Sequence, residues 1–305
     1  MGIAMRPFLS CLFAAALLAL VPAAQAQRGE LRIVHQERSL YRNILVTEDE
    51  ERLCMRFTVT ELNGLNQSCR FFDDHDKLVF PYAKMVLSSL MIQDNPSSIL
   101  ILGLGGGTLV HTYKTLFPNA KITIVEIDEA VVDVAKKYFD FEETDLIRTE
   151  VVDGRVYIKR EGLKGTKYDL IILDAFTGEY IPEHLMTAEF LEEVKKLLPE
   201  NGMLIANTFS TSRLYAAESN TYRQVFGEFF NVRMPGTGNR IIIASMQPLP
   251  DRATLEARAP AFNERVARFG MDMTEFPQLL VTKPDWNLRE RVLTDEYAPV
   301  NLLNN

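Results

Sequence analysis

The chain has 305 residues, of which 47% are hydrophobic and 24% are charged, proportions that are typical of a globular protein. With 33 Lys and Arg against 41 Asp and Glu, the net charge is −8, which argues against a protein that tracks the phosphate backbone of a nucleic acid. The length suggests one large domain or two unequal ones.

The first 26 residues differ from the rest because Arg6 is their only charged side chain. An apolar run over 7–21 follows, and the segment ends in the small-x-small pattern Ala24-Gln25-Ala26. An apolar run of about 15 residues is shorter than the roughly 20 that a membrane-spanning helix needs. The segment therefore predicts a signal peptide cleaved after Ala26, a periplasmic or secreted mature protein, and no stable membrane span after cleavage.

Two of the three cysteines, Cys54 and Cys69, lie beyond this segment in two strand-like stretches. Asn63-Gly64 between the stretches is a hairpin-turn signal. Export would place the pair in an oxidising compartment, where it could form a cross-strand disulfide. Two buried thiols remain the alternative, since the sequence does not determine the pairing register.

The mature chain changes its pattern near residue 97. Residues 30–75 alternate apolar and polar positions, which predicts a small antiparallel β unit, and the spacing over 80–93 predicts a helix. Apolar strands then alternate with helices, which predicts an α/β fold with a mostly parallel, seven-stranded sheet covered on both faces. The last two strands suggest an antiparallel hairpin at the sheet edge. The predicted division is a signal peptide at 1–26, a β-stranded domain at 27–78, a Rossmann-like nucleoside-binding domain at 79–247 and a helical tail at 248–305.

A glycine turn with Gly103, Gly105 and Gly107 follows the first apolar strand and opens a helix. Glycines there let the backbone turn sharply and approach a ligand. Glu126 ends the next strand, where a carboxylate can accept both ribose hydroxyls. These features fit NAD and an S-adenosylmethionine (AdoMet)-type nucleoside equally well, but Thr108 occupies the last glycine position of G-x-G-x-x-G, which argues against a dinucleotide.

The next two strand ends carry Asp153-Gly154 and Asp174. Four consecutive strand ends therefore bear Gly, Glu, Asp and Asp, a set that dinucleotide-binding proteins do not require. The alternative interpretation is that Asp153 and Asp174 only cap helices or begin turns.

In this order, the segments 101–107, 125–128, 152–154 and 168–174 resemble the spermidine synthase (polyamine aminopropyltransferase) family, and 293–300 resembles the tail of a divergent branch of it. The resemblance implies a β-stranded domain before an AdoMet-methyltransferase-like Rossmann domain. It also implies transfer of an aminopropyl group from decarboxylated AdoMet to a small-molecule amine. Family members are commonly dimers or tetramers, so the resemblance is compatible with a homodimer.

The resemblance also implies residue roles. Glu126 would hold the ribose and Asp153 would reach the adenine. Asp174 would orient and deprotonate the amine, which attacks the propyl carbon beside the sulfonium, and Tyr82 would help to place that amine. The implied nucleoside-binding set is Gly103, Gly105, Gly107, Glu126, Asp153, Gly154 and Gln67, with Tyr41 and Glu179 as candidate substrate contacts.

Several positions depart from the family pattern. The Asp of the family's glycine turn is Gly106 here, and the second Asp of the loop after Asp174 is Thr177. Two other positions carry the cations Arg42 and Lys84, which would repel a diammonium substrate and so disfavour putrescine. Loss of the Asp at Gly106 makes intact AdoMet, and with it methyl transfer, an alternative; a non-catalytic nucleoside- or polyamine-binding protein is another.

The four histidines do not show a metal-ligand spacing with Cys or with one another. We interpret His35, His75, His111 and His184 as surface or helix residues. The sequence therefore predicts no metal.

Overall fold

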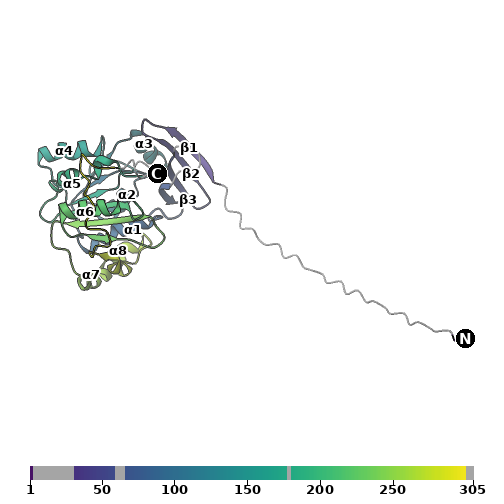
Figure 1. The fold of residues 1–305 in the computed structure, drawn as a ribbon. Helices are drawn as coiled ribbons and strands as arrows, with labels where there is room; N and C mark the ends of the chain where they lie inside the picture. The colour runs from purple at the N-terminus through teal and green to yellow at the C-terminus, as the bar shows by residue number, and fades with distance from the viewer. Residues whose placement is uncertain (3–30, 59–65, 177–179, 300–305) are drawn as a thin grey trace. The chain divides into compact units, whose positions relative to one another are not determined.

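The computed structural model describes residues 1–2, 31–58, 66–176 and 180–299. The described residues from Leu31 onward form one compact unit (Figure 1). Residues 3–26 of the predicted signal peptide, the turn signal Asn63-Gly64 and the candidate residue Glu179 lie outside the described residues, so the expectations placed on them stay predictions. The predicted domain boundaries also stay predictions.

The predicted antiparallel β unit is a four-stranded sheet. Alternate side chains of its middle strands, among them Ile44, Val46 and Met55, are buried against Val131 and Val134 of the neighbouring helix α3 (Glu129–Tyr138). The side chains that alternate with them, such as Leu45, Thr47 and Cys54, are buried as well, so both faces of the two middle strands are covered. The strands follow one another in the order β1 (Arg32–Arg38), β2 (Asn43–Glu48), β3 (Arg52–Thr58) and β4 (Asn66–Phe71).

Cys54 of β3 and Cys69 of β4 lie directly opposite each other in the strand register. They form a disulfide, with the two sulfur atoms 2.01 Å apart. Both residues are buried. The structure therefore has the disulfide rather than the two buried thiols that the sequence left as the alternative.

The second sheet contains the seven predicted strands and one more. Four neighbouring pairs are parallel, and β11 runs antiparallel to β9 and β10, so the predicted edge hairpin is confirmed. The order is β12 (Leu280–Val281), β10 (Phe230–Val232), β11 (Asn239–Ser245), β9 (Met203–Phe209), β8 (Leu170–Leu173), β5 (Ser98–Leu102), β6 (Lys121–Glu126) and β7 (Ile147–Val151).

The added strand β12 comes from the tail that the sequence predicted to be helical, so that part of the prediction is wrong. Asn231 and Val232 of β10 pair with Val281 and Leu280 of β12. An edge strand leaves backbone N–H and C=O groups without partners, and β12 supplies partners for them. A strand of two residues has no hydrophobic period, so the sequence pattern could not reveal it.

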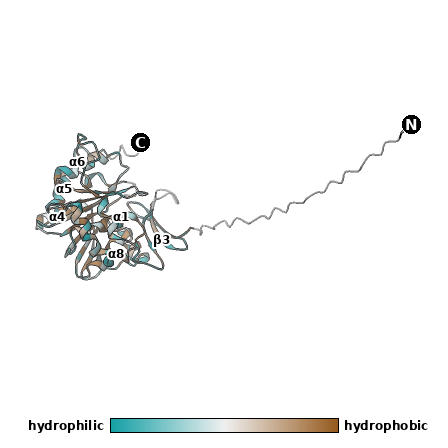
Figure 2. Ribbon diagram, turned by 90° about the horizontal axis from the view of Figure 1, so that it is seen from below, coloured by the Kyte–Doolittle hydropathy of each residue, from teal (hydrophilic) through white to brown (hydrophobic). Residues whose placement is uncertain are grey.

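Helices cover both faces of this sheet, as predicted (Figures 1 and 2). One face, with Ile99 and Ile101, packs on α1, α2 and the tail, and the other, with Leu100 and Leu102, packs on α4, α5 and α6. The helix predicted over 80–93 is an α-helix that continues as a 3-10 turn, Ser88–Met91. The α-helices besides α3 are α1 (Pro81–Leu87), α2 (Thr108–Leu116), α4 (Gly154–Lys164), α5 (Ala188–Lys195), α6 (Tyr215–Phe226), α7 (Arg252–Arg258) and α8 (Asn263–Ala267).

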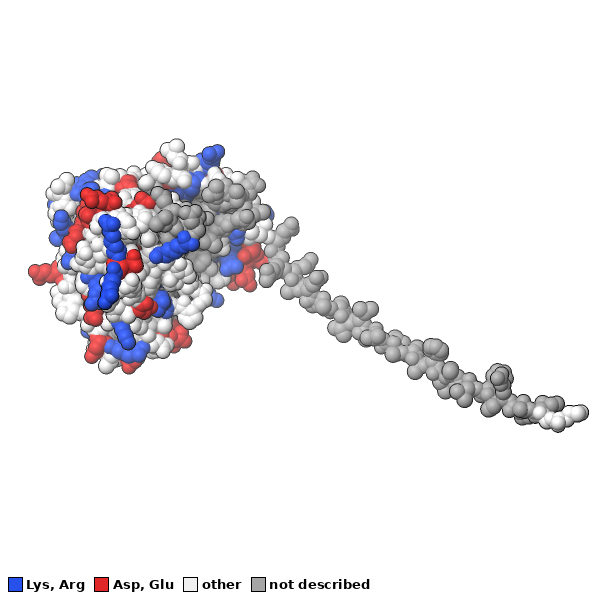
Figure 3. Space-filling view, viewed as in Figure 1, with Lys and Arg blue, Asp and Glu red and all other residues white. Residues whose placement is uncertain are grey.

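Acidic and basic side chains are interspersed on the face of the molecule seen in Figure 3. Within the described ranges, no helix is both long enough and apolar enough to cross a membrane.

Candidate active site

A cavity of about 530 Å³ lies where the carboxyl ends of β5, β6 and β8 meet the four-stranded sheet. Parallel strands present their carboxyl ends at one edge of a sheet, so residues far apart in the sequence come together there. The lining includes nine residues that the sequence singled out, namely Tyr41, Gln67, Tyr82, Gly103, Gly105, Glu126, Asp153, Gly154 and Asp174.

The glycine turn is needed for a close approach of two strands. Gly103 has φ +96°, and a Cβ atom built on it would lie 2.3 Å from the carbonyl oxygen of Asp174. Only glycine fits such a position without a shift of the backbone. Gly107 does not line the cavity; it precedes α2 with φ +77°, so its role is to start the helix.

Replacing Gly103 by Ala is expected to lower the free energy of unfolding by about 2 to 4 kcal/mol, because strain at positive φ adds to a clash with backbone atoms. Urea denaturation measures the loss. Gly165→Ala is the matched control, since Gly165 has φ +71° with nothing within 4 Å of the added Cβ. The control should lose only about 1 to 2 kcal/mol, and equal losses in the two variants would contradict the close-approach argument.

Glu126 ends β6 with its carboxylate held by backbone donors. Oε2 accepts from the Leu104 N–H at 3.0 Å, and Oε1 accepts from the N–H groups of Ile127 at 3.0 Å and Asp128 at 3.1 Å. Burial raises the pKa of Glu126, while the charge of Arg42 and the Leu104 N–H oppose that rise. The carboxylate is thus fixed at the cavity wall, with lone pairs left to accept from further donors.

Asp174 follows β8 and is held by two neutral donors. Tyr82 of α1 donates its hydroxyl to Oδ2 at 3.2 Å, and the Asn207 amide of β9 donates to Oδ1 at 2.8 Å. Burial raises the pKa of Asp174 to about 7, although both hydrogen bonds act to lower it. Burial and the neighbouring Asp174 raise the pKa of Tyr82 well above its ordinary value, so the phenol stays a donor. A carboxyl group that titrates near pH 7 can accept or give a proton at neutral pH.

Asn207 and Asn239 also line the cavity, although the sequence did not predict them as site residues. Asn239 of β11 donates to the Asn207 side-chain oxygen at 3.0 Å, so the two amides form a chain that ends on Asp174. An available signal was a polar Asn inside the otherwise apolar stretch of β9. A buried amide of this kind needs hydrogen-bond partners, which marks it as part of a polar site.

Asp153 fits both interpretations that the sequence offered. Its Oδ1 accepts from the Val156 N–H at 3.0 Å and caps α4, while the residue also lines the cavity. Oδ2 lies 2.8 Å from Nε2 of His184. Burial alone would raise the pKa of Asp153, but the hydrogen bonds from Val156 and His184 hold it below the ordinary value. His184 is exposed and lies in the 3-10 turn Glu183–Leu185, so its interpretation as a surface or helix residue is confirmed, but its contact with Asp153 was not predicted.

The described residues do not contain a group of three His, Cys, Asp or Glu side chains close enough to hold a metal ion.

A spermine/spermidine synthase domain model matches residues 79–238. A polyamine aminopropyltransferase from Vibrio vulnificus is 46% identical over 277 residues, which cover 90% of this chain and 92% of that protein. The chain belongs to the spermine/spermidine synthase family.

Two solved structures share the fold of this spermine/spermidine synthase family member. A probable spermidine synthase from Corynebacterium glutamicum has a TM-score of 0.65 at 20% identity and covers 86% of this chain and 99% of its own. Human methyltransferase-like protein 13, solved in complex with SAH, has a TM-score of 0.50 at 24% identity and covers 73% of this chain and 96% of its own. The fold is therefore shared between spermidine synthases and a methyltransferase-like protein.

The family's acidic position in the glycine turn is closed by neighbouring side chains here. A Cβ atom on Gly106 would lie 2.9 Å from Cδ1 of Phe139 and 3.0 Å from Cβ of Ser68. Ser68 is itself held, since its hydroxyl lies 3.2 Å from the hydroxyl of Thr108. The space that an Asp side chain would enter at this position is therefore filled by Phe139 and Ser68.

The two cations that replace family residues have different locations. Arg42 lines the cavity, stacks over Phe57, and donates from Nη1 to the Phe176 carbonyl at 3.1 Å; its Nε lies 3.6 Å from Asp128. Lys84 does not line the cavity and donates to the Gly270 carbonyl in the tail. The expectation that Lys84 repels a substrate is therefore wrong, because the Lys84 side chain points to the tail. Arg42, in contrast, does bring a positive charge to the site.

Proposed function

We propose that this protein is an aminopropyltransferase that moves the propylamine chain of an AdoMet-type nucleoside to an amine acceptor. The observation that carries the proposal is Asp174, a carboxyl group with a pKa near 7 that faces the cavity from a strand end and is oriented by Tyr82 and Asn207. The family relationship, including the relative described as a polyamine aminopropyltransferase, supports the same reaction class.

The proposed chemistry needs one proton acceptor. The amine nitrogen attacks the propyl carbon next to the sulfonium, the carbon–sulfur bond breaks, and its electron pair stays on sulfur to give a neutral thioether. One proton passes to Asp174, either from the ammonium form of the acceptor before the attack or from the ammonium group that the attack creates. Asp174 then returns this proton to solvent. An amine attacks only when neutral, so the ionised Asp174 is the active form. Holding the amine and the carbon in line supplies a further part of the acceleration.

In this proposal Glu126 accepts the ribose hydroxyls and Asp153 accepts from the base. Support comes from the two carboxylates on neighbouring strand ends of one cavity, each fixed by backbone N–H donors. The donor nucleoside would be decarboxylated AdoMet, with no metal taking part.

We infer an acceptor that places one amine at Asp174 and an apolar chain beyond it. Among the described lining residues the carboxylates are Glu126, Asp153 and Asp174, and the first two are assigned to the nucleoside. The remaining lining near Asp174 includes the rings of Phe80, Phe176 and Phe209, with Arg42 bringing a positive charge. A second ammonium would meet that charge, which disfavours a short diamine such as putrescine.

The alternative function is methyl transfer from intact AdoMet. Gly106 favours it, because the glycine turn has no acidic side chain there to repel the carboxylate of AdoMet. The shared fold with methyltransferase-like protein 13 is compatible with this alternative.

Binding and product mass separate the two functions. Purified protein is titrated with decarboxylated AdoMet, AdoMet and NAD, and binding is followed by the rise in melting temperature that a ligand of the folded state produces. We expect decarboxylated AdoMet to give the largest rise and an amine acceptor to gain the mass of one aminopropyl group. A gain of one methyl group from AdoMet would favour the alternative, and no shift with either sulfur nucleoside would contradict both.

We also propose that the protein is exported and loses residues 1–26. The composition of that segment supports this, and so does the Cys54–Cys69 disulfide, since disulfides persist mainly in oxidising compartments. Mass spectrometry of protein from the periplasmic fraction is expected to find a chain that begins at Gln27. Recovery of the uncleaved chain from the cytosolic fraction alone would contradict the proposal.

A further inference from the structure

The tail residues 293–299, which lie in the segment that resembles the tail of a divergent family branch, are docked onto the Rossmann domain. Leu293 is fully buried, and its carbonyl accepts from the Ala188 N–H at 2.9 Å. The Asp295 N–H donates to Glu189 at 3.0 Å, and the Thr187 hydroxyl donates to the Asp295 carboxylate at 2.7 Å. The tail is thus tied to the start of α5 by three separate hydrogen bonds.

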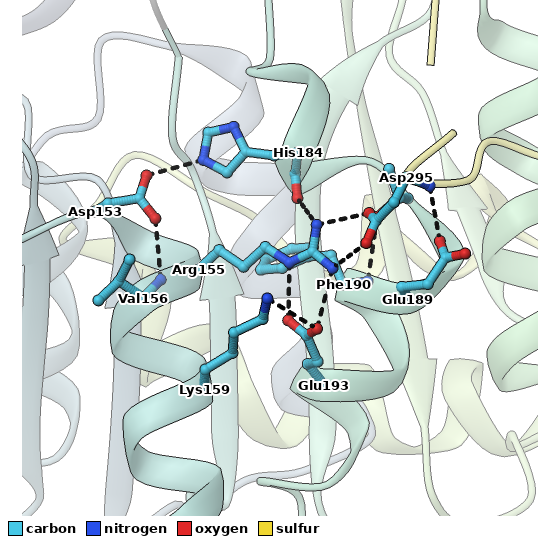
Figure 4. Close-up of polar contacts among 10 residues, drawn as sticks. Asp153, Arg155, Val156, Lys159, His184, Glu189, Phe190, Glu193 and Asp295 are labelled. Carbon is cyan, nitrogen blue, oxygen red and sulfur yellow. Dashed lines mark hydrogen bonds and ion pairs between the residues drawn. The ribbon is translucent and has the colours of Figure 1, made fainter. Parts of the chain in front are cut away.

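Arg155 is the centre of this contact (Figure 4). Its guanidinium group is buried and makes two forked contacts, one to Asp295 at 2.6 and 2.8 Å and one to Glu193 at 2.9 and 3.0 Å. Two-pronged Arg–carboxylate contacts of this kind hold both partners in one orientation. Removing Asp295 would leave Arg155 with a single fork and with unpaired donors next to the tail.

Arg155 also contacts the wall of the nucleoside cavity. Its Nη1 donates to the His184 carbonyl at 3.3 Å, and the His184 ring lies 2.8 Å from Asp153, as Figure 4 shows. His184 belongs to the short 3-10 turn Glu183–Leu185. A continuous chain of contacts therefore runs from Asp295 through Arg155 and His184 to Asp153.

We propose that Asp295, Arg155 and His184 are positioning residues for recognition of the purine base. They hold the Asp153 carboxylate in the orientation that accepts from the exocyclic amino group of adenine. A carboxylate only accepts hydrogen bonds, so it pairs with a 6-amino group and is left without a donor by a 6-oxo group. The inference rests on the proposed function, because that function places the base at Asp153.

Calorimetric titration of the full chain with methylthioadenosine and with its 6-oxo counterpart, methylthioinosine, tests the inference. Asp295→Ala and His184→Ala are each expected to weaken methylthioadenosine binding about 10-fold and to reduce its preference over methylthioinosine. The double variant Asp295→Ala, His184→Ala should bind methylthioadenosine no more weakly than the single variant that has the lower affinity, because both changes act through Asp153. Additive losses would overturn the proposed chain of contacts.

Three controls separate positioning from a general loss of structure. His184→Gln keeps a side-chain N–H for Asp153 and should restore most of the affinity. Asp295→Asn keeps one acceptor oxygen, so it should fold even if Asp295→Ala does not, and should weaken binding in the same direction. Glu150→Gln removes the ion pair between Glu150 of β7 and Arg160 of α4 (2.9 Å), which does not involve Arg155, and this variant should bind like the wild type.

The outcomes distinguish this inference from the proposed function. If the wild type binds methylthioadenosine while Asp295→Ala, Asp295→Asn and His184→Ala bind it equally well, the inference is overturned and the proposed function stands. If the folded wild type binds neither nucleoside, both are overturned.

Discussion

Replacing Asp174 by Asn is expected to lower turnover by about 10² to 10⁴ while nucleoside affinity stays near that of the wild type. Asn keeps the size of the side chain and can still accept from Tyr82, but it cannot take a proton from the amine. Single-turnover assays with saturating nucleoside measure the loss, and calorimetry measures the affinity. Asp145→Asn is the control, since Asp145 is an exposed loop residue. Full turnover in Asp174→Asn would exclude Asp174 as the base.

The ionisation of Asp174 also predicts how the activity depends on pH. The pKa of Asp174 lies near 7, so kcat/KM of the wild type should rise with pH through that region as the carboxyl group ionises. The residual activity of Asp174→Asn should lack this limb. A limb near pH 7 that persists in the variant would belong to another group.

Asp174→Asn should also stabilise the fold at high pH. The pKa of Asp174 is 3.8 before burial and about 7 in the folded protein, so between these values the folded state holds the proton that the unfolded state has lost. Stability therefore falls as pH rises through this window, by at most about 4 kcal/mol. Asn does not ionise, so the variant should be more stable than the wild type at pH 8, and the difference should vanish near pH 4. Urea denaturation at the two pH values measures it.

Removing the disulfide is expected to lower the free energy of unfolding by about 3 kcal/mol, the value for closing a loop of about 15 residues. Cys54 and Cys69 are 15 residues apart in the sequence. The test is urea denaturation of the double variant Cys54→Ala, Cys69→Ala. Wild type kept in dithiothreitol is the control that breaks the bond without removing side-chain atoms, and it should lose a similar amount. No change in either sample would show that the bond contributes nothing to stability.

The disulfide should affect the site as well. Cys69 is preceded by Ser68, which contacts Thr108 at the start of α2, and by Gln67, which lines the cavity. Loosening β4 is therefore expected to weaken nucleoside binding as well as the fold. The affinity of the double variant should be measured at low temperature, where it remains folded.

The strands of the Rossmann sheet could be predicted from the sequence because each strand has a distinct local pattern of residues. Buried parallel strands are continuous runs of Ile, Leu and Val, and helices between them keep a 3.6-residue spacing. The strand ends that carry Gly103, Glu126, Asp153 and Asp174 then had to meet, since parallel strands present their carboxyl ends at one edge. Strand β12 could not be predicted, because it forms only where the tail meets the edge of β10.

The remaining features depend on distances that no local pattern contains. Whether Arg42 and Lys84 both face the site was undecidable from their sequence neighbours, and the packing sends only Arg42 there. The roles of Asn207 and His184 likewise depend on contacts across 33 and 31 residues of chain.

By itself, the sequence determined the order of the elements, the family and the acidic residues of the strand ends, because each of these is set by residue type and local spacing. The tertiary structure decided which of the two cations faces the cavity, that Cys54 and Cys69 are bonded, that burial raises the pKa of Asp174, and that the tail reaches Arg155. These depend on burial and on contacts between distant segments, which arise only when the chain is packed.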